Sequence, residues 1–260
     1  WVRTLLCLSP LLFGFALPTA LLVRLLVREW TSVSPLAVAL WTRNTLWIGC
    51  LAALVVVTLT LTLNARARLY REPMALGVER VLSFGYAVPG AVLAIGILLP
   101  LAWLDGELIE WSKRWFGINP GLLLTGSIVA LVYAASIRFY GVAASAVSAA
   151  YARLPASLDD SARVLGVVGA AAFRRVHWPA VRASALAGML LVFIDTLKEL
   201  PATLTLRPFN FDTLATQTYN LVKDERLGEA ALPSLLIVLA SLPAVALLAR
   251  ARTARATRTE

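Results

Sequence analysis

Residues 121–143, GLLLTGSIVALVYAASIRFYGVA, form an apolar run that is long enough to cross a membrane as a helix. A transmembrane helix needs about 20 predominantly apolar residues, and this run holds one charged residue. Its apolar residues are continuous and do not alternate with polar ones, which favours a helix over a strand of a membrane barrel. The run therefore predicts an all-α membrane protein.

The rest of the chain has the same character. Of its 260 residues, 59% are hydrophobic and 15% are charged, whereas about a quarter of the residues of a soluble domain are charged. The apolar blocks predict six spans, at residues 4–27, 45–63, 81–104, 121–143, 184–206 and 232–249. Cys7 and Cys50 fall in apolar segments without metal or redox spacing, and we interpret them as inert thiols.

The net charge of +9 is distributed unevenly between the loops. Arginines gather in alternate loops and at the C-terminus: Arg66, Arg68, Arg71, Arg153, Arg163, Arg174, Arg175, Arg182, Arg250, Arg252, Arg255 and Arg258. The other loops hold acidic residues: Asp105, Glu107, Glu110, Asp212, Asp224, Glu225 and Glu229. Because Lys and Arg mark the cytoplasmic side, both termini are predicted to be cytoplasmic. Arginines beside anionic lipid account for the basic balance, and no nucleic acid is expected as a partner.

The longest predicted cytoplasmic loop, residues 144–183, carries helical signals of its own. Ser157 and Asp160, three residues apart, have the spacing of a capping box, which predicts a helix start. Gly166 is placed to end that helix in a left-handed conformation. The loop is therefore predicted to fold as a helix followed by a turn.

A second short helix is expected through residues 170–173, with Pro179 as its stop. The alternative is a solvated basic linker. Such a linker has no need of the apolar side chains of this loop, which require a covering surface: Val164, Leu165, Val167, Val168, Phe173, Val176 and Trp178. His177 is the only histidine of the chain, so we expect an interface residue there and no metal site.

The loop resembles the cytoplasmic EAA loop of ABC-transporter permeases of the binding-protein-dependent import class. That family's pattern is E-A-A, three residues, G, nine residues, I, any residue, L-P. The same spacing is present here at Asp160, Ser161, Ala162, Gly166, Val176, Trp178 and Pro179. Four identities differ: Asp replaces Glu, Ser replaces the first Ala, Val replaces Ile and Trp replaces Leu. The resemblance implies that these seven residues dock on a separate ATP-binding subunit and transmit its movement.

Other stretches extend the resemblance. RNTL at 43–46 and YAVPG at 86–90 are similar to the start of the permease core and to its next span. TLKELPATL at 196–204 and RPFNFDTLA at 207–215 are similar to ferric-iron importers of this class. Those permeases are often one polypeptide with two homologous halves. The missing Met and the six predicted spans make this chain look like the C-terminal half, or an excised single copy of it.

The resemblance implies a six-span type I ABC importer transmembrane domain. Residues 1–43 would be the first span and an external loop, residues 44–249 the permease core with the EAA-type loop at 144–183, and residues 250–260 a basic cytoplasmic tail.

Three charged residues, Asp195, Lys198 and Glu199, fall inside the predicted fifth span. Each charge near a helix centre costs roughly 2.5–3.5 kcal/mol. Their spacing places them on one helical face, so Lys198 can neutralise one carboxylate while the other needs a partner elsewhere. They either line a translocation path or form a structural ion pair. Pro201 is expected to bend or end the helix just after them.

The function that the resemblance implies is that of an importer permease, with ferric iron as the leading cargo. Thiamine, a phosphonate or a polyamine is the alternative within the class. A proton-coupled secondary transporter or a membrane-embedded enzyme that uses the three charges is the alternative from another class. No ATPase or hydrolase motif occurs, so no catalytic, metal or cofactor residue is expected, and ATP would be bound by a partner.

The expected partners are a cytoplasmic ATP-binding subunit dimer, a second permease half, fused or separate, and an external substrate-binding protein. The lipid bilayer is the remaining contact. The expected location is the bacterial cytoplasmic (inner) membrane.

Overall fold

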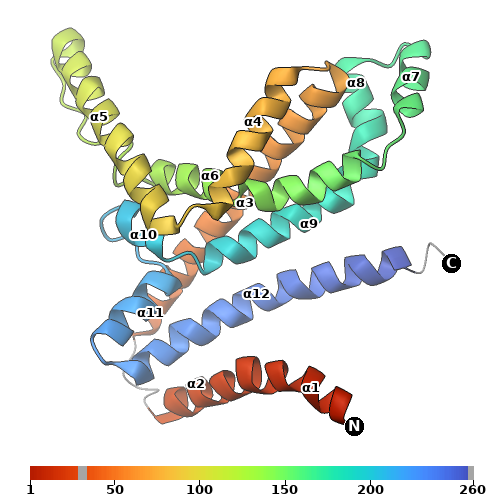
Figure 1. Cartoon of the computed structure of the whole chain (residues 1–260). Helices are drawn as coiled ribbons and strands as arrows, with labels where there is room; N and C mark the ends of the chain where they lie inside the picture. Colours follow the sequence, from red (N-terminus) through yellow and green to blue (C-terminus); the bar gives the residue numbers. More distant parts are fainter. Residues whose placement is uncertain (29–33, 257–260) are drawn as a thin grey trace. The chain divides into compact units, whose positions relative to one another are not determined.

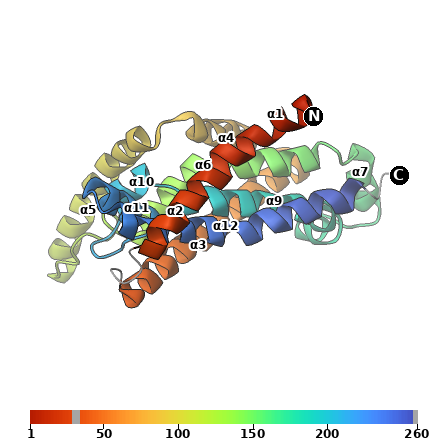
Figure 2. The same cartoon turned by 90° about the horizontal axis from the view of Figure 1, so that it is seen from below.

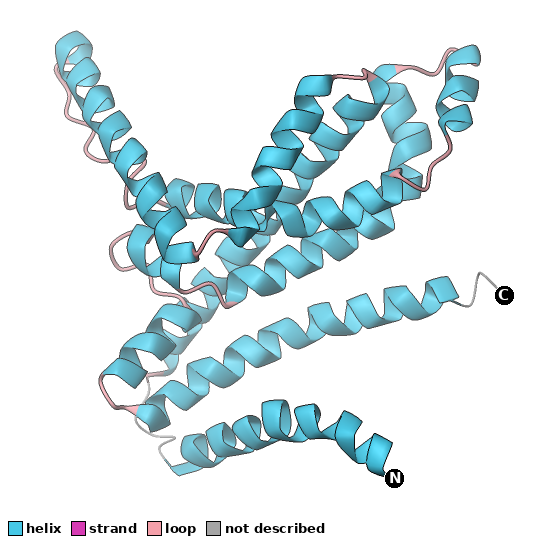
Figure 3. Cartoon of the chain, in the orientation of Figure 1, coloured by secondary structure: helices cyan, strands magenta, loops and turns pink. Residues whose placement is uncertain are grey.

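A computed structural model describes residues 1–28 and 34–256. These residues form helices and no strand (Figure 3). Six helical stretches among them are long and apolar enough to cross a membrane: Leu6–Arg28, Pro35–Leu69, Gly90–Phe116, Ile128–Tyr151, Gly169–Leu197 and Leu227–Arg250. The expected all-α, six-span architecture is therefore confirmed. Residues 29–33 of the expected external loop and residues 257–260 of the expected tail lie outside the described residues.

The helices follow one another as labelled in Figure 1. In chain order they are α1 Val2–Leu11, η1 Leu12–Ala16, α2 Leu17–Arg28, α3 Pro35–Leu69, α4 Pro73–Ser83, η3 Phe84–Ala87, α5 Gly90–Phe116, α6 Ile128–Tyr151, α7 Ala156–Val164, α8 Gly169–Ala172, η4 Phe173–His177, α9 Trp178–Leu197, α10 Pro201–Leu206, α11 Leu214–Lys223 and α12 Leu227–Ala256.

The chain divides into two compact units. The smaller unit comprises Trp1–Trp47 and Asn210–Pro243, and the larger unit comprises Ile48–Phe209 and Ala244–Glu260.

The core of the larger unit lies where α3, α6 and α9 pack together. It is rich in alanine and valine, and α6 and α9 run side by side in both views (Figures 1 and 2). At Gly188 of α9 an added Cβ would lie 3.2 Å from the Cα of Ala143. Small residues let membrane helices approach this closely, and close packing drives their association.

Helix α4 and the turn η3 pack on α6 through glycines. A Cβ at Gly85 would overlap the backbone carbonyl of Ile137, and one at Gly141 would lie 2.9 Å from the carbonyl oxygen of Ser83. The third span consequently begins at Gly90, after this separate helix, and not at residue 81 as predicted.

In the smaller unit, two stretches that resemble the importer family meet. The Asn44 amide donates to the carbonyl of Asp212 at 3.0 Å, and the Leu214 amide donates to the Thr45 hydroxyl at 2.8 Å. Thr213 caps α11 in a reciprocal arrangement with Thr216. The start of α11 is thereby fixed against α3.

The fifth span differs from its prediction at both ends. It runs from Gly169 to Leu197, whereas residues 184–206 were predicted. Pro179 does not stop a helix: a π-turn at Phe173–His177 joins α8 to α9, with the Trp178 amide bonded to the Phe173 carbonyl, and Pro179 lies in the first turn that follows. The π-turn interrupts the regular hydrogen-bond ladder directly before Pro179, which has no N–H to donate to it. Pro201 instead begins the separate helix α10.

Candidate functional site

The loop between α6 and α9 folds as two short helical segments around a left-handed turn. Helix α7 ends with the Val167 amide bonded to the Ala162 carbonyl at 2.8 Å, and Gly166 has a φ of +72°. This is the C-terminal arrangement that a glycine permits. The predicted capping box does not form, because the helix already begins at Ala156 and has no side-chain cap.

The expected docking residues lie on two faces of this loop. Asp160, Ser161, Gly166, Trp178 and Pro179 are exposed. Ala162 is buried, and Val176 is half-buried. The outward set is therefore free to meet a partner, while the inward pair fixes the loop on its own chain.

Apolar side chains surround the turn without cover. Val164 is 88% exposed, Leu165 is 78% exposed and Val168 is 60% exposed. The three flank Gly166 and lie outside the membrane-length stretches. A cluster of this kind marks an interaction site more often than a solvated linker.

Beneath α7, Asp159 joins two side chains from distant parts of the chain. Its Oδ2 accepts from Arg68 Nε of α3 at 2.7 Å, and its Oδ1 accepts from His177 Nε2 at 2.8 Å. The ring of Tyr151 lies edge-on to the imidazole, with centroids 5.5 Å apart. His177 is completely buried, so the expectation of an interface residue there is wrong. We call Arg68, Asp159 and His177 the loop anchor.

The electrostatics of the anchor favour an ionised Asp159. Burial raises the pKa of the Asp159 carboxyl, but the hydrogen bonds from Arg68 and His177 oppose it and hold that pKa below its ordinary value. The sequence indicated Asp159 only as an acid in the first turn of a helix, and not its contacts, since Arg68 precedes it by 91 residues and no local pattern connects them.

The three charges expected inside the fifth span lie at its end, and this placement corrects the prediction. Asp195 belongs to the last turn of α9, whereas Lys198 and Glu199 follow its final residue, Leu197. Lys198 Nζ lies 2.9 Å from Asp195 Oδ1 and is largely exposed. The cost of charge at a helix centre therefore does not apply to the lysine.

Glu199 pairs with a residue that the sequence did not indicate. Its Oε2 lies 3.0 Å from Arg138 Nε of α6, and its Oε1 accepts from the Ala202 amide at 3.2 Å. Arg138 also donates to the Val88 carbonyl at 3.2 Å. Gly90 leaves room for this pair, because a Cβ there would lie 2.5 Å from Arg138 Nη1. The ion pair thus links the start of α5 to α6 and α10.

Asp195 also lines a polar cavity of about 560 Å³ in the larger unit. The oxygen-bearing side chains around it are Glu79, Ser83, Tyr86, Ser145, Ser148 and Asp195. Glu79 Oε1 accepts from Ser148 Oγ at 2.6 Å and from Asn64 Nδ2 at 3.3 Å. Two carboxylates and several hydroxyls line this cavity, and oxygen ligands of this kind suit a hydrated or hard cation.

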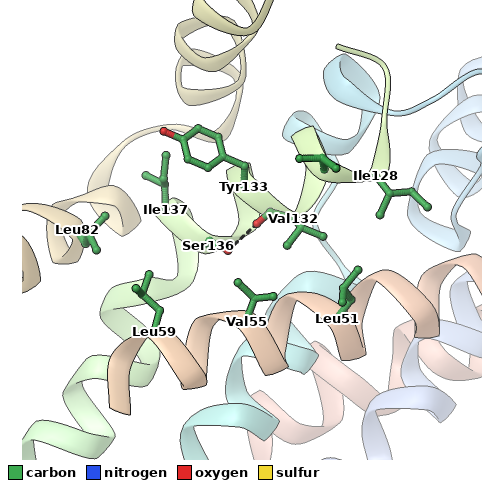
Figure 4. A pocket seen from close by; sticks show the side chains of 10 residues that line it. Leu51, Val55, Leu59, Leu82, Ile128, Val132, Tyr133, Ser136 and Ile137 are labelled. Carbon is green, nitrogen blue, oxygen red and sulfur yellow. Dashed lines mark hydrogen bonds between the residues drawn. The ribbon is translucent and has the colours of Figure 1, made fainter. Parts of the chain in front are cut away.

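A second hollow, of about 420 Å³, differs in chemistry (Figure 4). Leu51, Val55 and Leu59 of α3 line one side of it. The hydroxyl of Ser136 donates to the Val132 carbonyl of its own helix at 2.7 Å and leaves the surface apolar. This hollow suits lipid chains, and the polar cavity is the better candidate for an ion.

Comparison with known proteins supports the family expectation. No family model matches the chain. Over 198 residues the chain is 26% identical to the Fe(3+)-transport system permease protein FbpB 2 of Haemophilus influenzae. The matched segment covers 76% of this chain and 36% of that relative, so the chain spans about a third of the relative's length. Over three quarters of its residues, this multi-pass membrane protein therefore resembles a ferric-iron transport permease.

Proposed function

We propose that the chain is the transmembrane permease part of an ATP-driven importer, and that a separate cytoplasmic subunit binds and hydrolyses the ATP. The observation that carries this proposal is the uncovered apolar turn around Gly166, at the position where the loop spacing resembles the ATPase-docking loop of importer permeases.

In this proposal the outward residues of the loop make the contact. Asp160 lies at the surface of α7, where its side chain is 66% exposed and pairs only loosely with Arg163, at 3.3 Å. Ser161, Gly166, Trp178 and Pro179 complete the contact. Ala162 and Val176 hold the turn in shape from inside. ATP closes the partner subunits, the loop moves with them, and the spans change access from one side to the other.

The arginine distribution supports an orientation with this loop and both termini in the cytoplasm. The membrane would be the bacterial inner membrane. The other partners are a second permease half, fused or separate, and an external binding protein that delivers the cargo. The chain itself needs no cofactor and performs no ATP hydrolysis.

Ferric iron is the proposed cargo. The similarity to an Fe(3+)-transport permease and the resemblance of residues 196–215 support it. The polar cavity adds a physical reason, because carboxylate and hydroxyl oxygens are the ligands that hard cations prefer. Glu79 and Asp195 would carry the cation through the larger unit, while the Arg138–Glu199 pair holds the helix ends beside the path.

The test is uptake by the complete complex in liposomes, with labelled ferric iron delivered by the binding protein. ATP-dependent uptake of iron, and none of thiamine, a phosphonate or a polyamine, is the expected result. ATP-dependent uptake of one of those three compounds would refute ferric iron as the cargo, while the chain would still be part of an ATP-driven importer. Uptake that follows a proton gradient and persists without any ATPase would overturn the importer proposal.

A further inference from the structure

Two adjacent carboxylates of α7 point in opposite directions. The side chain of Asp160 is 66% exposed, whereas that of Asp159 is 14% exposed and bonded to Arg68 and His177. The outer carboxylate is available to a docked partner, and the inner one holds the same helix to the membrane part of the chain. The two residues therefore serve different steps.

The Arg68 guanidinium is bonded on all three of its nitrogens. Nε donates to Asp159, Nη1 donates to the Tyr151 carbonyl at 2.7 Å, and Nη2 donates to the carbonyls of Leu154 and Pro155 at 2.8 and 3.1 Å. Tyr151 is the last residue of α6, whose final carbonyls have no partner within the helix. A planar five-donor fork satisfies this set of acceptors, and an ammonium group does not match its geometry.

Three membrane helices consequently meet at one carboxylate. Arg68 belongs to the C-terminal end of α3 and bonds to the end of α6, and His177 is the last residue before α9. The same three helices build the core of the larger unit. A force on α7 thus has a short, hydrogen-bonded route into that core.

We infer that Asp159 is a positioning residue, which locks the docking helix α7 onto α3, α6 and α9 so that movement of the docked loop is passed to the membrane helices. This inference rests on the proposed function. It concerns the transmission of movement and not the contact with the ATPase, which the exposed residues make.

The experiment uses the complete complex in liposomes and measures three quantities: ATPase affinity, the rate of ATP hydrolysis, and cargo moved per ATP. For Asp159→Asn we expect unchanged affinity and a fall in cargo per ATP on the order of tenfold, within the usual range of coupling between sites. Asp159→Glu, which keeps the charge, should restore part of the cargo moved per ATP. Arg68→Lys should lower the cargo moved per ATP as much as Asp159→Asn does.

The matched control is Glu72→Gln. Glu72 accepts two hydrogen bonds from Arg66, at 2.9 and 2.8 Å. Arg66 belongs to α3, as Arg68 does, and precedes it by two residues. That pair is exposed and holds no part of the loop. Cargo per ATP should remain unchanged in this variant.

An unchanged ratio in Asp159→Asn would overturn the inference, and so would a loss of ATPase binding, which would make Asp159 a docking or folding residue. Amide hydrogen exchange on the chain alone gives an independent measurement. Asp159→Asn should speed exchange in α7 while exchange in α6 and α9 stays as in the unaltered chain. If the unaltered chain binds no ATPase, the proposed function is wrong. Unchanged exchange in α7 of Asp159→Asn would separately refute the inference that Asp159 holds α7 on α3, α6 and α9.

Discussion

Replacing Gly166 by alanine tests the turn on which docking depends. Gly166 has a φ of +72°, and an added Cβ would meet nothing within 4 Å. The whole cost of the substitution therefore comes from the backbone, because a left-handed conformation costs an L-residue roughly 1–2 kcal/mol. The reduced entropy of the unfolded segment returns about 0.4–1 kcal/mol. The net loss is about 1 kcal/mol, roughly a fivefold shift in the equilibrium that forms the turn.

The assay is the affinity of the ATP-binding subunit for the chain in nanodiscs. Gly166→Ala should weaken binding by at most about fivefold, because the affinity for a partner that recognises only the formed turn follows the fraction of chains in which that turn is formed. Gly166→Asn should weaken it less, because asparagine visits the left-handed region readily. Gly96→Ala is the control, since that site in α5 is equally open but has ordinary helical backbone.

Equal affinity for the alanine variant and the unaltered chain would refute the role of the turn. If asparagine weakens binding as much as alanine does, the partner rejects any side chain at residue 166, and the backbone argument fails.

Three further predictions concern charges and close contacts. Gly90→Ala should lower the melting temperature, because its Cβ would lie 2.5 Å from Arg138 Nη1 and 3.0 Å from Glu199 Oε1, and the guanidinium must move away from its ion pair, at a cost of about 1 kcal/mol; Gly96→Ala in the same helix should not lower it. Glu199→Gln should impair cargo uptake while ATPase binding persists, and failure of the complex to assemble would instead show that the Arg138 pair is needed for folding of the chain and not only for the path. The lowered pKa of Asp159 means that its anchor contributes stability above the unfolded pKa of about 3.9, and loses it as pH falls through the lower folded value. The difference in melting temperature between the unaltered chain and Asp159→Asn should thus hold from pH 7 to about 5 and shrink below about 4, with Arg68 and His177 as the side chains that face the carboxylate; a loss already at pH 6 would contradict this.

The spans were predictable because each one needs only a local apolar run, and all six appear in the described residues. The ends of the spans were less predictable. A π-turn before Pro179 carried the helix through a residue that normally stops one, and Pro201 began a helix of its own. Gly166 was predicted correctly because a left-handed turn depends on one residue and its neighbours.

The contacts of the charges were not predictable in the same way. Arg68 reaches Asp159 and Arg138 reaches Glu199 only after the helices pack, and no spacing in the sequence records either pair. The interpretation of the arginines as markers of the cytoplasmic side stays a prediction, and it did not indicate that Arg68 joins α3 to the loop. Pairs of this kind form between residues that are distant in the sequence, whereas the patterns of a single sequence report on neighbouring residues.

The most direct test of the central proposal is a photo-cross-linking residue at Leu165, which is 78% exposed beside the turn. In membranes that hold the complete transport system, the account predicts a cross-link to a protein with a nucleotide-binding P-loop, identified by mass spectrometry. Cross-links to lipid alone, or none to such a protein, would contradict the proposal that this loop docks an ATPase.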